Sequence, residues 1–234
     1  MTYIKEDMPP FRYLVVTLHH AYQNFQRMNT PPIIIANARP SQASRIATLI
    51  MEAMNHECCQ YFAGPQHSLA DFHRMMTRLV GREDSQYSYL NTLVAVAEQP
   101  TGGDADTEVS ELVGICVSYD GALLRPLRQA FVEEALTEFG IDHSGMDDET
   151  QAGELYVDSL AVDSHYRGHG IASALLRATC AKATRLCLPA AGLLVDKGNP
   201  QAERLYKRLG FRFVEDAEWG GHPMKHLQRA ADKP

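Results

Sequence analysis

The segment Leu155–Ala178 constrains the fold of this chain more than any other. It opens with a dense apolar run from Leu155 to Val162, which has the length and β-branched character of a buried strand. A polar turn follows, and a pattern after it places Ile171, Ala174, Leu175 and Ala178 on one helical face. The segment therefore predicts a strand, a glycine-containing loop and the start of a helix.

The loop Arg167-Gly168-His169-Gly170 has the composition of an anion site. The exposed N–H groups and the positive dipole end of a first helical turn attract anions. Glycine lets the backbone approach a phosphate because no Cβ intervenes, and the Arg167 guanidinium matches phosphate oxygens. The loop predicts a phosphate-binding turn, and an ordinary glycine-tolerant turn is the alternative.

A second segment repeats the order of strand, turn and helix. Leu193–Val195 reads as a short strand, Asn199 as a helix N-cap and Pro200 as the first helical residue. Gly210 is placed to end that helix. Asn199 and Tyr206 lie two turns apart, so they share one helical face.

These two segments together resemble the motifs of the GNAT superfamily of acyl-CoA-dependent N-acetyltransferases. Arg167, Gly170 and Ala172 match its R-x-x-G-x-A pyrophosphate loop. The second motif, N-x-x-A-x-x-L-Y-x-x-x-G-F, is matched by Asn199, Ala202, Leu205, Tyr206, Gly210 and Phe211. The motifs cover 155–213, and upstream of them the resemblance rests on the order of elements.

The resemblance implies an α/β fold with a mixed, mostly antiparallel central sheet and helices on both faces. A splay is expected between the strands near Leu160 and Leu194. We expect residues 1–32 to be an N-terminal extension, 33–229 the acetyltransferase domain and 230–234 a tail. Residues 121–152 exceed the minimal family pattern and predict a helical insertion with an acidic loop, which either walls the acceptor site or packs as a decoration or dimer contact.

Acetyl-CoA is the co-substrate that the resemblance implies. Tyr206 would donate to the departing thiolate, since a phenol with a pKa of about 10 remains a donor at neutral pH. The residues expected to hold the cofactor are Leu160, Ala161, Val162, Arg167, Gly168, His169, Gly170, Ile171, Ala172, Asn199 and Tyr206.

The general base is expected on the strand that precedes the loop. Asp158 and Glu154 share strand parity with Leu160, and Asp158 is nearer the expected thioester. Tyr119 and Asp120 end the preceding strand and are candidates for contact with the acceptor. For each carboxylate, a hydrogen-bonded structural role is the alternative.

Composition excludes several other classes of protein. A net charge of −7 argues against non-specific nucleic-acid binding, and no apolar run approaches the roughly twenty residues that span a bilayer. The five cysteines show no C-x-x-C spacing, which predicts reduced thiols and no metal site. We expect a cytoplasmic monomer or homodimer.

The function expected is direct transfer of an acetyl group from acetyl-CoA to an amine of a small molecule, within a ternary complex. A protein N-acetyltransferase and a non-catalytic acyl-CoA-binding module are alternatives. A dinucleotide-binding enzyme is a further rival because Gly168-x-Gly170 opens a helix. Against it, Ser173 stands where a third glycine belongs.

Overall fold

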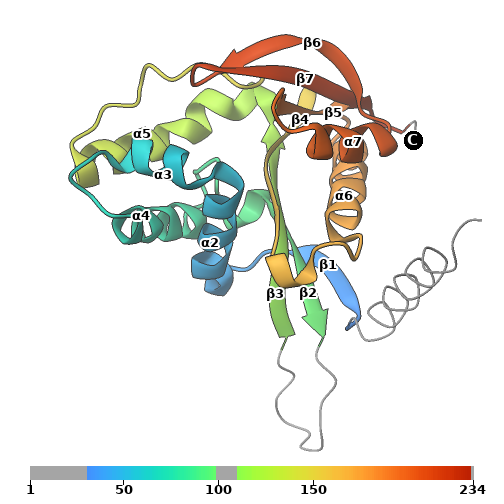
Figure 1. Ribbon diagram of the computed structural model, residues 1–234, viewed down its shortest axis with the longest axis horizontal. Coiled ribbons are helices and arrows are strands. Elements are labelled where there is room, and N and C mark those ends of the chain that lie inside the picture. Colours follow the sequence, from blue (N-terminus) through green and yellow to red (C-terminus); the bar gives the residue numbers. More distant parts are fainter. Residues whose placement is uncertain (1–30, 99–109, 233–234) are drawn as a thin grey trace, which may run out of the picture.

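The computed structural model describes residues 31–98 and 110–232, so residues 1–30 of the expected N-terminal extension and the last two residues of the expected tail lie outside the described residues. The described part forms a sheet of seven strands in the order β1-β2-β3-β4-β5-β7-β6 (Figure 1). The strands are β1 (Ile33–Asn37), β2 (Thr92–Glu98), β3 (Ser110–Asp120), β4 (Glu154–Val162), β5 (Ala190–Asp196), β6 (Arg212–Trp219) and β7 (His222–Ala230), and the α-helices are α2 (Ala43–Met54), α3 (His56–Ala63), α4 (Leu69–Gly81), α5 (Leu124–Phe139), α6 (Ile171–Arg185) and α7 (Pro200–Arg208).

The only parallel pair in the described sheet is β4 with β5, and it separates almost at once. Glu154, Leu155 and Tyr156 pair with Ala190, Ala191 and Gly192, and the pairing then stops. Beyond Tyr156, β4 stays paired with β3, while β5 stays paired with β7 as far as Asp196. The expected mixed sheet and its splay near Leu160 and Leu194 are therefore confirmed.

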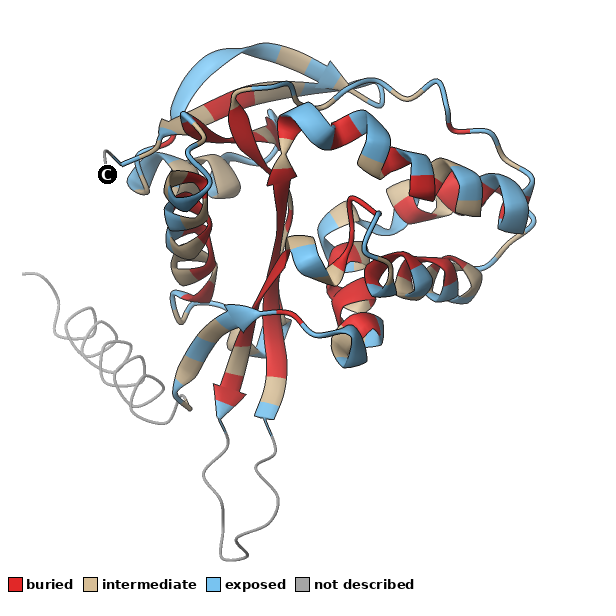
Figure 2. Cartoon of the chain, turned by 180° about the vertical axis from the view of Figure 1, so that it is seen from behind, coloured by how far each residue is buried: buried red, intermediate tan, exposed pale blue. Residues whose placement is uncertain are grey.

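Helices cover both faces of the sheet, as expected. On one face α2, α3, α4 and α5 share a core with inward residues of β2 and β3. On the other face α6 packs its buried Ile171, Leu175 and Leu176 against β4 and β5, with α7 alongside. Figure 2 shows the buried residues of the sheet between these two helical layers.

Helix α5 forms the first half of the predicted insertion over 121–152. Its buried Phe131 and Ala135 belong to the same core as α2, α3 and α4, and its ring contacts include Phe62 of α3. The following segment, 140–153, has no helix or strand and connects α5 to β4. Removing α5 would expose the α3–α4 layer, so this helix is an integral part of the domain.

Several local signals in the sequence have the expected structure. Asn199 caps α7 by accepting from the Ala202 N–H at 3.0 Å, and Gly210 follows the helix at a φ of +89°. Strand β7 continues to Ala230, which pairs with Ala190. The domain thus extends one residue into the predicted tail. No described helix is both long and apolar enough to cross a bilayer.

A β-bulge at Asp158 changes the alternation of side chains along β4. Val157 pairs with Ser118 and Ser159 pairs with Val117, so Asp158 is the extra residue. Leu160 consequently packs with the α6 core, whereas Asp158 reaches Tyr119 on the opposite face. The predicted shared parity of Asp158 and Glu154 with Leu160 is therefore wrong, because the bulge lies between them.

The closed end of the splay is held by the Glu154 carboxylate. It accepts from His226 at 2.9 Å and from Gln228 at 2.8 Å, both on β7, and so it reaches across β5. This path crosses Gly192 of β5, where a Cβ would overlap the carboxylate. A glycine at 192 is thus a condition for the buried contact between β4 and β7.

We predict that Gly192→Ala destabilises the fold by about 1–3 kcal/mol, because the new methyl group displaces a fully buried, hydrogen-bonded carboxylate. Urea unfolding measures the change. Gly81→Ala is the matched control, since a Cβ at the end of α4 meets nothing within 4 Å. Equal stability of the two variants would contradict the role given to Gly192.

Candidate functional site

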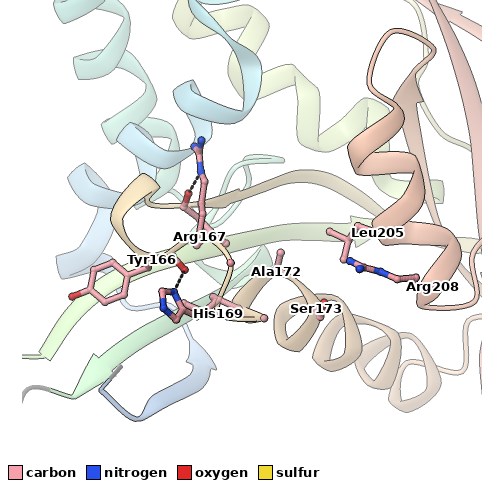
Figure 3. Close-up of a pocket in the computed structure, with 11 residues that line it drawn as sticks. Tyr166, Arg167, His169, Ala172, Ser173, Leu205 and Arg208 are labelled. Carbon is pink, nitrogen blue, oxygen red and sulfur yellow. Dashed lines mark hydrogen bonds between the residues drawn. The ribbon is translucent and has the colours of Figure 1, made fainter. Parts of the chain in front are cut away.

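A cavity of about 720 Å³ lies at the open end of the splay, between the loop before α6 and helix α7. Val162 and the loop form one side, and Leu205 and Arg208 of α7 lie opposite (Figure 3). Among the residues expected to hold the cofactor, those that line this cavity are Val162, Arg167, Gly168, His169, Gly170, Ile171 and Ala172.

The N-terminus of α6 opens into this cavity without a side-chain cap. Gly170 occupies the N-cap position at a φ of +81°, and Gly168 has a φ of +83°. Both values lie in the left-handed region that favours glycine. Because no side chain accepts from the first turn, the N–H groups of Ile171, Ala172 and Ser173 remain available to an anion.

The loop is anchored on both sides before it reaches α6. Asp163 pairs with Arg45 of α2 and accepts from the His165 N–H, and these contacts lower the pKa of the carboxyl to about 2. The Tyr166 hydroxyl donates to Glu111 of β3 at 2.8 Å. The anchors hold the loop in place before any ligand arrives.

Arg167 is exposed and makes two contacts with the protein. Its Nε donates to the Val162 carbonyl at 2.9 Å, and a terminal nitrogen lies 3.7 Å from Glu52 of α2. The side chain is 62% exposed, so the guanidinium keeps donors free to solvent. Arg208, which the motifs do not include, adds a second cation from α7.

Tyr206 packs on the α6 face, with its ring 5.9 Å from that of Phe211. Burial and the nearby Cys116 thiol raise the pKa of its hydroxyl to about 12. Among the described residues the hydroxyl has no hydrogen-bond partner, and it does not line the cavity itself. Tyr206 is therefore a protonated donor throughout the neutral pH range.

Asp158 faces the other side of the sheet, just past the last β4–β5 pair. Its carboxylate accepts from Ser159 at 2.8 Å, from the Tyr119 hydroxyl at 3.0 Å and from Gln86 at 3.2 Å. Burial raises the pKa of the carboxyl above its ordinary value, although the three donors oppose that effect. Asp158 as a whole residue is half-buried.

A second carboxylate, Glu149 of segment 140–153, meets the same Tyr119 hydroxyl at 3.1 Å. Burial and the Asp158 charge raise the pKa of Glu149 to about 7, against the effect of the Arg128 guanidinium that contacts it. The pairing of Tyr119 with these carboxylates places one of the predicted acceptor residues beside the predicted base.

The other two candidates have structural partners. Glu154 is fully buried, and hydrogen bonds from His226, Thr150 and Gln228 lower its pKa despite the burial. Asp120 caps the turn after β3 by accepting from the Ala122 N–H at 3.0 Å. Both carboxylates therefore make structural hydrogen bonds within the fold.

The structure separates the expected cofactor residues into four groups, one of which is Tyr206, which packs on the α6 face and does not line the cavity. The loop residues and Val162 meet at one cavity. Leu160 lies on the α6 face and Ala161 on the α2 face of the splayed part of β4. The side-chain oxygen of Asn199 caps the N-terminus of α7.

The described residues include no group of three or more His, Cys, Asp or Glu side chains that could hold a metal ion.

Comparison with known proteins agrees with this geometry. Residues 129–211 match the model of the acetyltransferase (GNAT) family, from within α5 to the end of the second motif. The fold is similar to a crystal structure of an acetyltransferase, with 25% identity, a TM-score of 0.66, and coverage of 85% of this chain and 100% of that one. No match was found among curated proteins.

Two further solved structures share the fold. An N-acetyltransferase from Staphylococcus aureus Mu50 has 21% identity and a TM-score of 0.65, over 83% of this chain and 99% of that one. A structure described as histone acetyltransferase HPA2 and related acetyltransferase, from Corynebacterium glutamicum, has 18% identity and a TM-score of 0.56, over 88% and 98%. These two likenesses show the fold, and together with the family match they lead to one conclusion: residues 129–211 match a GNAT-family acetyltransferase domain, within a GNAT-like fold.

Proposed function

We propose that this protein transfers an acetyl group from acetyl-CoA to an amine of a small molecule, directly and within a ternary complex. The observation that carries the proposal is the uncapped N-terminus of α6, which opens into a cavity lined by Arg167, Gly168 and Gly170. Such a site suits a pyrophosphate, because it supplies backbone donors, a helix dipole and a guanidinium together.

Acetyl-CoA would extend from this loop along the splayed edge of β4. The backbone of residues 158–161 has no partner on β5, which leaves polar groups of this edge available on that side. Val162 lines the cavity and lies on this edge, so it connects the two regions. In this placement the pantetheine amides pair with β4 as a strand would, and the thioester reaches the closed end of the splay.

Acetyl transfer needs a donor for the leaving sulfur and an acceptor for the amine's proton. The amine nitrogen attacks the thioester carbon, the C–N bond forms and the C–S bond breaks. CoA leaves as a thiol. When the acceptor starts as an ammonium, its nitrogen loses two protons during the reaction. One ends on the sulfur of CoA and the other on a base.

Tyr206 and Asp158 are suited to these two tasks. Tyr206 remains protonated at neutral pH because its pKa is raised to about 12, and it lies on the cofactor face of the sheet. Asp158 has a raised pKa and lies on the opposite face, at the start of the splay. We assign the donor role to Tyr206 and the base role to Asp158.

The acceptor is proposed to be a small cationic amine. Two carboxylates, Asp158 and Glu149, converge on Tyr119 beside the proposed thioester position. A buried negative cluster favours an ammonium over a neutral or anionic ligand. The likeness to a structure described as histone acetyltransferase HPA2 and related acetyltransferase keeps a protein amine as the second candidate.

Charge reversal at Arg167 tests the cofactor site. We expect Arg167→Glu to weaken acetyl-CoA binding at least about tenfold, since it replaces charge-assisted hydrogen bonds by repulsion. Isothermal titration calorimetry measures the affinity. Arg185→Glu, the same change at the exposed far end of α6, should bind normally. Equal loss in both variants would show a general charge effect.

Removing the Tyr206 hydroxyl tests the donor role. We expect Tyr206→Phe to lower kcat about 100-fold or more and to leave acetyl-CoA affinity nearly unchanged, because the leaving sulfur loses its proton donor while the ring packing remains. A thiol-release assay with a panel of amines gives kcat. Retention of full kcat would assign protonation of the sulfur to another group.

Neutralising Asp158 tests the base. We expect Asp158→Asn to abolish the acidic limb of the rate profile that reflects ionisation of this carboxyl, and to lower kcat about 100-fold or more. The rate is measured between pH 5 and 9. A variant with the wild-type limb and turnover would exclude Asp158.

A further inference from the structure

The Tyr119 hydroxyl lies between two carboxylates, 3.0 Å from Asp158 Oδ2 and 3.1 Å from Glu149 Oε1. A phenol has one hydrogen, so it donates to only one of them. The second contact is a hydrogen bond only when the other carboxyl carries a proton and donates to the phenol oxygen. Both contacts are hydrogen bonds at the same time only if the pair of carboxyls holds one proton.

The charges around the two carboxyls also favour one retained proton. Arg128 of α5, 8% exposed at its side chain, contacts Glu149 and also pairs with Asp148. Tyr87, Tyr119, Tyr156 and the Cys116 thiol also lie near the pair and are neutral at neutral pH, while Glu154 and Lys182 lie farther out, near Tyr156 and Cys116. One guanidinium thus faces two partly enclosed carboxylates, and a retained proton removes the excess charge.

Gln86 provides an independent sign that the cluster accommodates another donor. Its Nε2 donates to Asp158, while its Oε1 is buried and has no hydrogen-bond partner within the described part of the chain. The residue is 4% exposed. If the Gln86 amide were flipped, its oxygen would face the Asp158 carboxylate, which cannot donate to it, and its N–H group would lose this acceptor. An N–H group that enters beside Asp158 would satisfy the oxygen.

We propose that Glu149 and Asp158 share a single proton through the Tyr119 hydroxyl, and that Glu149 is a positioning residue that sets how readily Asp158 accepts a proton from the acceptor amine. The second clause rests on the proposed function, and the first does not. Nothing in the two GNAT motifs marks Glu149, which reaches the site from segment 140–153.

The proton count of the proposed step balances. Before the reaction the pair holds one proton and a net charge of −1. The ammonium gives one proton to Asp158 and becomes a nucleophilic amine, while the pair becomes neutral. After product leaves, the pair returns that proton to solvent. Arg128 holds Glu149 in place throughout through its contacts with residues 146–149.

The pH dependence of stability tests the shared proton without substrate or cofactor. The pKa of Glu149 is raised from 4.5 to about 7 in the folded chain, so the folded state binds more protons than the unfolded state between those values. Stability must then fall as pH rises through this window. Urea unfolding at intervals from pH 4.5 to 8 should show the fall in the wild type.

Two variants separate the pair from the rest of the chain. Glu149→Gln should be less stable overall but should show a clearly smaller fall across the window. Asp147→Asn, an identical change at an exposed neighbour in the same segment, should keep the wild-type fall. The same slope in all three proteins would overturn the shared proton.

The positioning role is tested by the rate profile. In Glu149→Gln the two-step pH dependence should collapse to a single limb that belongs to Asp158, because no second carboxyl releases a proton near pH 7 beside it. A lower rate with the two-step dependence intact would make Glu149 structural only. If Glu149→Gln does not fold, carboxyl carbon NMR titration of the wild type replaces it: coupled two-step titrations support the pair, and single steps near ordinary carboxyl values overturn it.

Discussion

The early separation of β4 from β5 is the constraint on which the rest of the site depends. Parallel pairing lasts for three residues on each strand, and then each strand keeps only its outer partner. Glu154 closes the narrow end by reaching over Gly192 to β7. The bulge at Asp158 begins where the pairing stops. Without the separation, the edge of β4 would have no free backbone groups and the loop before α6 would have no cavity beside it.

The splay also divides the chemistry between two faces of one sheet. The α6 face carries the glycine loop and the Tyr206 hydroxyl, which are donors. The opposite face carries Asp158 and Glu149, which are acceptors. The Cys116 thiol of β3 raises the pKa of Tyr206, and the Asp158 carboxylate raises the pKa of Cys116. Cys116 therefore lies between the groups on the two faces of the sheet. A reaction that moves one proton to a sulfur and another to a base suits this division.

Local signals in the sequence predicted most elements of the fold. The strand over 155–162, the Asn199 cap, the stop at Gly210 and the glycines before α6 depend on neighbouring residues, and the structure contains each of them. The fold of the whole sheet came from the resemblance of two motifs. The parity of Asp158 could not be predicted, because the bulge depends on the register with β3.

The acidic cluster was only partly accessible to sequence analysis. Asp158 and Tyr119 were candidates from their strand positions, but Gln86 lies 72 residues from Asp158 and Glu149 lies 30 from Tyr119. Neither belongs to a motif, and the acidic segment before β4 resembles an ordinary solvated loop. Glu154 was the second candidate for the base, and its structural role could not be predicted because its partners His226 and Gln228 are more than 70 residues away. Tertiary contacts decided these assignments.

Calorimetric titration of the wild-type protein with acetyl-CoA, and separately with NADH, tests the central claim most directly. The account predicts micromolar binding of acetyl-CoA and no binding of NADH, because the loop before α6 and the splayed edge of β4 together match an acyl-CoA. Binding of NADH without acetyl-CoA would promote a dinucleotide site, and absence of binding to acetyl-CoA would contradict the account.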